Sequence, residues 1–136
     1  MTRDVATARP RARRVVAALL LAATIVAGLV VSGVLPDGTA TDIAGDALYA
    51  VAAYLAVVLI APRLRPLAAG AIAAAWCVAV ELFQLTGLPL AWGAQLSPVM
   101  LVLGTVFDPR DLVVYVAMIA LATAVDAALG KASGPR

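Results

Sequence analysis

Four long, predominantly apolar runs constrain the fold of this chain more than any other feature. The runs cover about residues 15–35, 46–62, 67–86 and 109–129. About 20 apolar residues in an α-helix cross the hydrocarbon core of a bilayer. The chain has 136 residues, of which 64% are hydrophobic and 13% charged, and a soluble domain of this size has no interior large enough for them. The runs therefore predict an all-α, polytopic membrane protein with four transmembrane helices.

The segments around these runs complete the predicted organisation. Residues 1–14 form a basic tail, residues 15–129 a single transmembrane domain, and residues 130–136 a second tail. A cleaved signal peptide is the alternative for the first run, but a run of this length favours a retained helix. Residues 88–106 carry no charge and contain several prolines and glycines. We expect a re-entrant or interfacial segment there, before the last helix, with a fifth span as the alternative.

The basic residues predict the orientation of the four helices. With four spans, nine of the ten lysines and arginines fall on one side, and only Arg110 falls on the other. Cytoplasmic loops of membrane proteins are enriched in lysine and arginine. We therefore expect both termini in the cytoplasm. A fifth span would move Lys131 and Arg136 to the outer side and weaken this asymmetry.

The acidic residues gather on the opposite, outer side. Six of the eight lie there in this topology: Asp37, Asp42, Asp46, Glu81, Asp108 and Asp111. Glu81 and Gln84 are three residues apart, so they share one helix face. Asp111 and Tyr115 are four apart and also share a face. We predict an outer-leaflet binding site formed by Asp46, Glu81, Gln84, Asp108, Asp111 and Tyr115.

Each of these acids also has a purely structural interpretation. Asp108 before Pro109 is typical of a helix N-cap, and Asp111 would then complement the helix dipole. Asp46 near the start of its helix has the same alternative. Glu81 follows a fully apolar run, where a charge costs about 2.5–3.5 kcal/mol on insertion scales. Glu81 therefore favours a functional role, with structural stabilisation as the competing explanation.

Several kinds of chemistry are disfavoured by what the chain lacks. It has no histidine and a single cysteine, Cys77, within an apolar run. Imidazole acid–base catalysis, a Cys–His nucleophile pair and a histidine-based metal site are thereby excluded. We expect no catalytic residues, no metal and no cofactor. The basic residues lie beside hydrophobic runs and form no stripe that reads a nucleic acid, so no nucleic-acid partner is expected either.

Three motifs resemble a known family of small bacterial membrane proteins, domain of unknown function 2809 (DUF2809). They are Gly45-Asp46-Ala47-Leu48-Tyr49, Glu81-Leu82-Phe83-Gln84, and Leu103-Gly104-Thr105-Val106-Phe107 followed by Asp111-Leu112 and Tyr115. The resemblance covers about residues 15–128 and implies a location in the bacterial plasma membrane, without implying an activity. A looser likeness to the VanZ-like family rests on Glu81 with Gln84 and Asp108 with Asp111. That family usually has an asparagine where Tyr115 stands here.

These observations favour a non-enzymatic membrane protein whose acidic site binds a lipid headgroup, an envelope precursor or a partner. Its expected partners are the lipid bilayer and either another membrane protein or a second copy of the chain. One alternative is an enzyme or accessory factor acting on a lipid-linked envelope substrate, with two carboxyl groups as acid and base. Another is a small transporter subunit, although the acids crowd one leaflet and trace no path across the membrane.

Overall fold

Four long helices form the protein, and the computed structural model describes residues 2–93, 104 and 106–132. The long helices are α1 (Thr2–Val34), α2 (Thr39–Ile60), α3 (Pro66–Gln84) and α6 (Pro109–Ala132), with a short helix α4 (Leu88–Gly93) after α3. Each long helix contains a stretch long and apolar enough to cross a membrane. The predicted all-α, multi-pass membrane fold is confirmed. Most of the predicted re-entrant segment, residues 94–103 and 105, lies outside the described residues.

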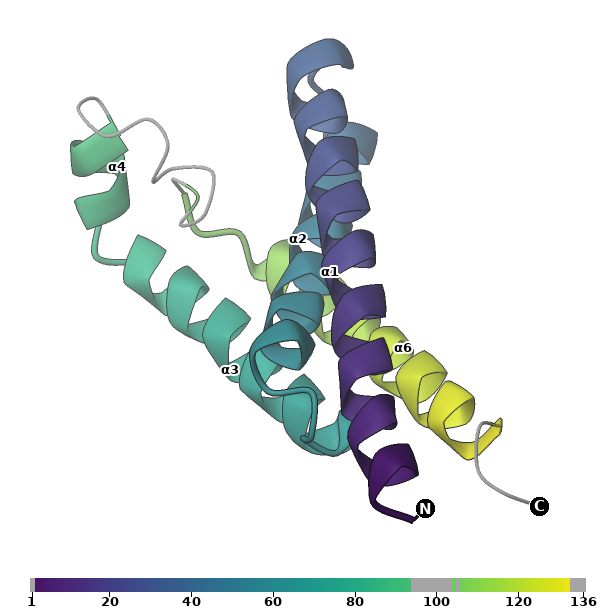
Figure 1. Ribbon diagram of the computed structural model, residues 1–136. Helices are drawn as coiled ribbons and strands as arrows, with labels where there is room; N and C mark the ends of the chain where they lie inside the picture. The colour runs from purple at the N-terminus through teal and green to yellow at the C-terminus, as the bar shows by residue number, and fades with distance from the viewer. Residues whose placement is uncertain (1, 94–103, 105, 133–136) are drawn as a thin grey trace.

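The long helices alternate in direction, so the two ends of the bundle carry different residues. The start of α1 and the end of α6 lie at one end, together with the turn between α2 and α3 (Figure 1). We call this the Arg13 end, and the opposite end, where α3 stops and α6 begins, the Glu81 end. Helix α2 packs on α1, α3 and α6, and α3 also packs on α6. Helix α1 packs extensively on α2 alone among the described helices, which leaves it at the side of the bundle.

Proline, glycine and hydroxyl groups at the helix ends determine boundaries that the hydropathy pattern predicted only in part. Pro66 stands at the start of α3 after an extended Arg65, as proline prefers. Helix α2 begins at Thr39 and not near residue 46, because the break between α1 and α2 is confined to residues 35–38. The Thr41 hydroxyl donates to the Gly38 carbonyl over 2.7 Å within the first turn. Asp46 is therefore well inside α2, and the dipole explanation offered for it does not apply.

The other boundaries differ less from the predicted ones. Helix α1 begins at Thr2, so most of the predicted tail 1–14 is helical, and its uncharged run starts at Val15. Helix α3 ends at Gln84 and α6 continues to Ala132. Gly87 follows α3 with φ +71°, and its N–H donates to the Gln84 carbonyl over 3.0 Å. A left-handed glycine in this place ends a helix without steric cost.

The core of the bundle is built from small residues, as is usual where membrane helices approach closely. Ala50, Ala69, Ala73 and Cys77 are buried, and Tyr54, Val58, Tyr115 and Ile119 fill the spaces between them. Helices α3 and α6 approach each other closely at Gly70. A Cβ atom there would clash with Oγ1 of Thr123, so glycine allows these two helices to meet.

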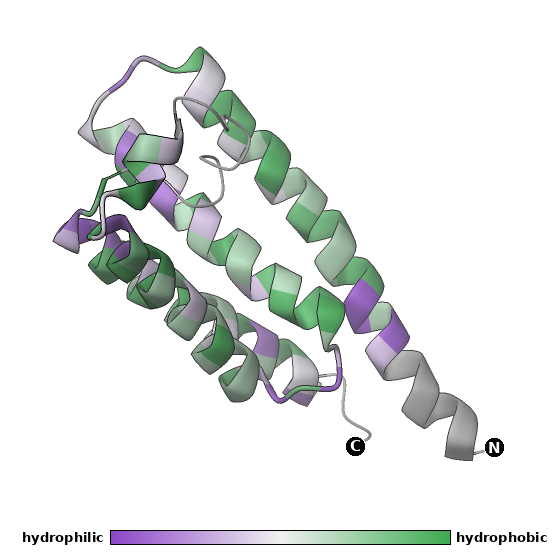
Figure 2. Cartoon of the chain, turned by 90° about the vertical axis from the view of Figure 1, so that its left-hand side faces the viewer, coloured by the Kyte–Doolittle hydropathy of each residue, from purple (hydrophilic) through white to green (hydrophobic). Residues whose placement is uncertain are grey.

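The outward faces of the long helices are strongly apolar. Large exposed hydrophobic side chains include Leu19, Val26, Leu67, Val113 and Leu129. Figure 2 shows hydrophobic colouring along the helix bodies and hydrophilic colouring concentrated towards their ends. A water-soluble protein of this size rarely exposes such a large continuous apolar surface. The surface fits the hydrocarbon of a lipid bilayer.

Candidate functional site

Two carboxyl groups meet at the Glu81 end of the bundle. Asp46 on α2 and Asp111 on α6 bring their carboxyl groups close enough to interact directly. Two carboxylates this close repel one another unless a proton or a cation lies between them. The pair therefore concentrates acidic groups at the junction of two helices.

Aromatic side chains connect the same helices directly beside the carboxyl pair. The rings of Tyr49 on α2 and Tyr115 on α6 lie 5.8 Å apart at an angle of 49°. On α3, the indole N–H of Trp76 donates to the Tyr49 hydroxyl over 3.0 Å. The Trp76 side chain is 48% exposed and takes part in this polar cluster.

Glu81 lies behind this cluster, fully enclosed by protein. Its exposed fraction is 0%, and neither carboxyl oxygen has a well-aligned hydrogen bond. The Tyr115 side chain and the backbone of Asp108 are the polar groups closest to it. A buried polar group without adequate hydrogen bonds costs about 1–3 kcal/mol. Such a group in a folded protein calls for an explanation, and a bound partner is one of the standard explanations.

Gln84 lies one turn after Glu81 and is also buried, with 7% exposure. The backbone of Gly104 passes directly over its amide group. A Cβ atom at Gly104 would lie 2.5 Å from Nε2 of Gln84, and the φ of Gly104 is +61°. Only glycine satisfies both the space and the backbone conformation. This close approach places Gly104 against the end of α3.

Asp108 is committed to capping α6. Its Oδ1 accepts from the backbone N–H of Arg110 over 2.8 Å, which confirms the N-cap interpretation of the sequence. Its other oxygen forms an ion pair with the Arg110 guanidinium at 3.3 Å, and both side chains are close to half exposed. An ion pair this exposed contributes little to stability. Asp108 therefore belongs to the edge of the predicted site.

A groove connects this polar cluster to the apolar part of the bundle. It has a volume of about 670 Å³, within the range of roughly 300–1,000 Å³ typical of ligand sites. At its polar end lie Asp46, Tyr49, Gln84 and Tyr115. Its long wall comes from α1 and α2 and includes Leu21, Ile25, Gly28, Leu29, Leu48 and Ala52.

The two hydroxyl groups of this wall do not make it polar. Thr24 donates to the Leu20 carbonyl over 2.7 Å, and Ser32 donates to the Leu29 carbonyl over 3.4 Å. Both hydroxyls are thus directed at the backbone of their own helix. The groove consequently has one acidic end and one long apolar side.

Of the six residues predicted for the site, the structure brings five together. Asp46, Glu81, Gln84, Asp111 and Tyr115 lie at or directly behind the polar end of the groove, whereas the carboxyl group of Asp108 caps α6. Binding by these residues stays a prediction. The comparison with protein families adds one decisive observation: the model of the family described as "Protein of unknown function (DUF2809)" matches residues 35–118.

The chain belongs to the DUF2809 family. The matched region contains all three motifs on which the resemblance rested, and it is shorter than the predicted range of 15–128. The likeness to the VanZ-like family is not borne out. No curated protein and no solved structure matches the chain.

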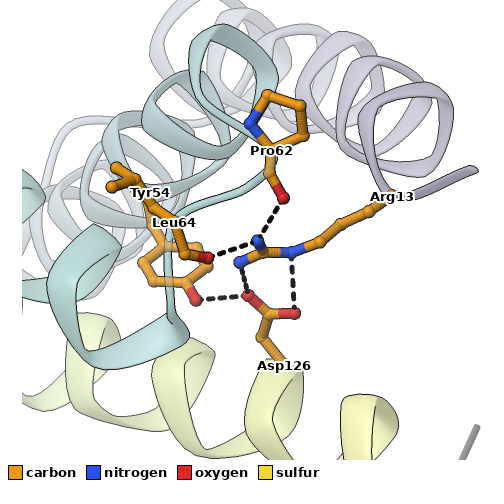
Figure 3. A network of polar contacts seen from close by, with 5 residues as sticks. All are labelled: Arg13, Tyr54, Pro62, Leu64 and Asp126. Carbon is orange, nitrogen blue, oxygen red and sulfur yellow. Dashed lines mark hydrogen bonds and ion pairs between the residues drawn. The ribbon is translucent and has the colours of Figure 1, made fainter. Parts of the chain in front are cut away.

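This DUF2809 protein has a second polar cluster, at the Arg13 end, which sequence reasoning missed (Figure 3). Arg13 on α1 binds both carboxylate oxygens of Asp126 on α6, at 3.2 Å and 2.5 Å. Its Nη1 also donates to the carbonyl oxygens of Pro62, at 2.7 Å, and Leu64, at 2.6 Å. The Tyr54 hydroxyl donates to Asp126 over 2.6 Å. The cluster thus joins α1, α2, the following turn and α6.

A sequence signal for this cluster existed. Asp126 is a lone acid within an apolar helix, on the side that carries nearly all the arginines. An ionisable residue in a membrane span calls for a named partner. Arg13 and Asp126 are separated by 113 residues, however, so the spacing rules that paired neighbours on one helix gave no indication of the partner.

Proposed function

We propose that this DUF2809 protein binds an amphipathic molecule with a cationic headgroup, and that the groove between α1, α2 and α3 is the binding site. The observation that carries the proposal is the composition of this groove. Its polar end contains Asp46, Gln84 and Tyr115, and its long wall is apolar. A water-soluble ligand would leave the apolar wall unused, and a pure hydrocarbon would leave the acids without a partner.

The charges at the polar end favour a cation. Asp46 and Asp111 place two carboxyl groups together, and Glu81 adds a third behind them, whereas Arg110 is already paired with Asp108. Electrostatic attraction is stronger here than in water, because the surrounding protein and lipid screen it poorly. A primary ammonium group also donates three hydrogen bonds, which suits carboxyl, amide and phenol oxygens.

The arrangement of the helices favours entry from the lipid. Helix α1 packs extensively on α2 but not on α3 or α6, among the described helices. One side of the groove therefore faces the surrounding bilayer between α1 and α3. A lipid-like molecule reaches such a site by lateral diffusion, without leaving the membrane.

The proposal includes an orientation in the bacterial plasma membrane. Nine of the ten basic residues belong to the Arg13 end, which supports a cytoplasmic location for both termini. The acidic end of the groove then opens at the outer leaflet. The ligand is accordingly a cationic amphiphile of the outer leaflet or an envelope precursor with an amine in its headgroup.

The proposed function is tested by measuring how stabilisation of the protein depends on the headgroup of the ligand. Protein in lipid nanodiscs is unfolded by heat in the presence of hexadecylamine, hexadecanol or hexadecanoate, and Trp76 in the groove reports binding by fluorescence. At one hundred times its dissociation constant, the amine is expected to stabilise the fold by about 2.7 kcal/mol. The alcohol and the carboxylate, of equal chain length, are expected to stabilise it much less. Equal stabilisation by all three would contradict recognition of the headgroup by the acids.

A further inference from the structure

Three arginines surround a small cavity at the Arg13 end. Arg11 and Arg14 come from α1, and Arg63 comes from the turn between α2 and α3. Together with Pro10 and Pro62 they line a cavity of about 150 Å³. The two sets of residues are far apart in the sequence. Their convergence is therefore a product of the fold and not of a local run of charge.

The neighbouring Arg13 cluster holds the two segments in a defined relation. Arg13 binds the carbonyl oxygens of Pro62 and Leu64 and the Asp126 carboxylate at the same time. Arg14 reaches the same region, with Nη2 donating to the Ile60 carbonyl over 3.4 Å. Helix α2 has no basic residue in its own last turn. Arginines of α1 thus supply the positive charge that stabilises the C-terminal carbonyl groups of α2.

The arginines around the cavity have no acidic partner among the described side chains. Asp126 already binds Arg13 and Tyr54, and the other ion pair, Asp108 with Arg110, is at the Glu81 end. Three guanidinium groups around one small cavity repel one another. An anion bound between them would remove this repulsion and use N–H donors that the protein leaves free.

The position of the cavity indicates which anion. The uncharged run of α1 begins at Val15, directly after Arg14, while α2 ends at Ile60 and α3 begins at Pro66. The cavity therefore lies where hydrocarbon gives way to the headgroup layer, at the depth of the lipid phosphates. Arginine binds phosphate oxygens through two parallel N–H groups, and basic residues at this depth attract anionic lipids.

We infer that the cavity formed by Arg11, Arg14 and Arg63 binds the phosphate of an anionic phospholipid in the leaflet at the Arg13 end. This site is independent of the acidic groove and of its proposed ligand. It differs from a diffuse basic surface because its arginines come from two segments fixed by the Arg13 cluster. One lipid molecule is expected to occupy the cavity, with its acyl chains against the neighbouring apolar helix faces.

A pair of charge-matched double variants tests the inference. The first is Arg11→Gln with Arg63→Gln, which removes two arginines of the cavity and keeps the contact of Arg14 with Ile60. The control is Arg65→Gln with Lys131→Gln, which removes two positive charges near the same end but outside the cavity. Native mass spectrometry of the detergent-purified protein, titrated with phosphatidylglycerol or phosphatidylcholine, measures retained lipid.

Wild type and the control are expected to retain one phosphatidylglycerol in preference to phosphatidylcholine. The cavity variant is expected to bind phosphatidylglycerol at least tenfold more weakly. Equal losses in both variants would overturn the inference in favour of diffuse surface charge, and no loss in either would also overturn it. Inorganic phosphate is the third arm. If it stabilises wild type while phosphatidylglycerol is not retained, the site takes a soluble anion and the lipid assignment is wrong.

Discussion

Replacement of Asp126 by asparagine is expected to lower the free energy of unfolding by about 3 kcal/mol. The Asp126 carboxylate accepts hydrogen bonds from Nε and Nη2 of Arg13 and from the Tyr54 hydroxyl. Loss of this carboxylate leaves the Arg13 guanidinium without a counter-charge. The side chains of Arg13 and Asp126 are only 23% and 21% exposed. Removing one partner of a buried pair costs about 3–5 kcal/mol, and partial exposure places this pair at the lower limit.

Unfolding in mixed detergent micelles, followed by loss of helical circular dichroism, measures this effect. Asp37→Asn is the control because it makes the same chemical change at an exposed residue between α1 and α2. The control is expected to change stability by less than about 0.5 kcal/mol. Tyr54→Phe removes one hydrogen bond and is expected to cost about 1 kcal/mol. If Asp126→Asn were as stable as Asp37→Asn, the Arg13 cluster would have no part in holding the helices together.

Replacement of Gly28 by phenylalanine is expected to abolish binding of an alkylamine in the groove while leaving the fold intact. Gly28 lines the groove from α1, and a Cβ atom there meets nothing within 4 Å. A phenyl ring therefore has room to enter the groove and occupies the volume that an alkyl chain would use. Glycine is a poor helix former, so the substitution is also expected to favour the helix slightly.

Gly33→Phe provides a matched control on the same helix. A Cβ atom at Gly33 would likewise meet nothing within 4 Å, but this residue does not line the groove. Isothermal titration of both variants in nanodiscs with hexadecylamine separates the effects. Gly28→Phe is expected to weaken binding at least tenfold, which corresponds to about 1.4 kcal/mol. The groove would be excluded as the binding site if both variants bound with the affinity of wild type.

The sequence was sufficient to predict the four membrane helices and the end at which the acids gather. Runs of about 20 apolar residues are long enough to cross a bilayer as helices. Successive spanning helices must then run in opposite directions. The start of α2 was predicted too late because Thr41, Asp42 and Gly45 are typical of turns. Thr41 and Asp42 are compatible with a first helical turn, Gly45 lies within the helix, and the break occurs at residues 35–38 alone.

The contacts within the site were less predictable than its location. Spacing on one helix placed Glu81 with Gln84 and Asp111 with Tyr115, but it contains no information on which faces of different helices meet. The proximity of Asp46 to Asp111, the Trp76–Tyr49 hydrogen bond and the groove along α1 all depend on packing between helices. The same limitation hid the pairing of Arg13 with Asp126.

The central claim, that acids at the Glu81 end bind a cationic headgroup, is tested most directly by neutralising them one at a time. Glu81→Gln and Asp46→Asn keep the size of each side chain, and Asp37→Asn again serves as the control. Stabilisation by hexadecylamine in nanodiscs is the measurement. We predict that both site variants fold as stably as wild type without ligand and lose most of the stabilisation, whereas the control keeps it. Full stabilisation of both site variants by the amine would contradict the claim.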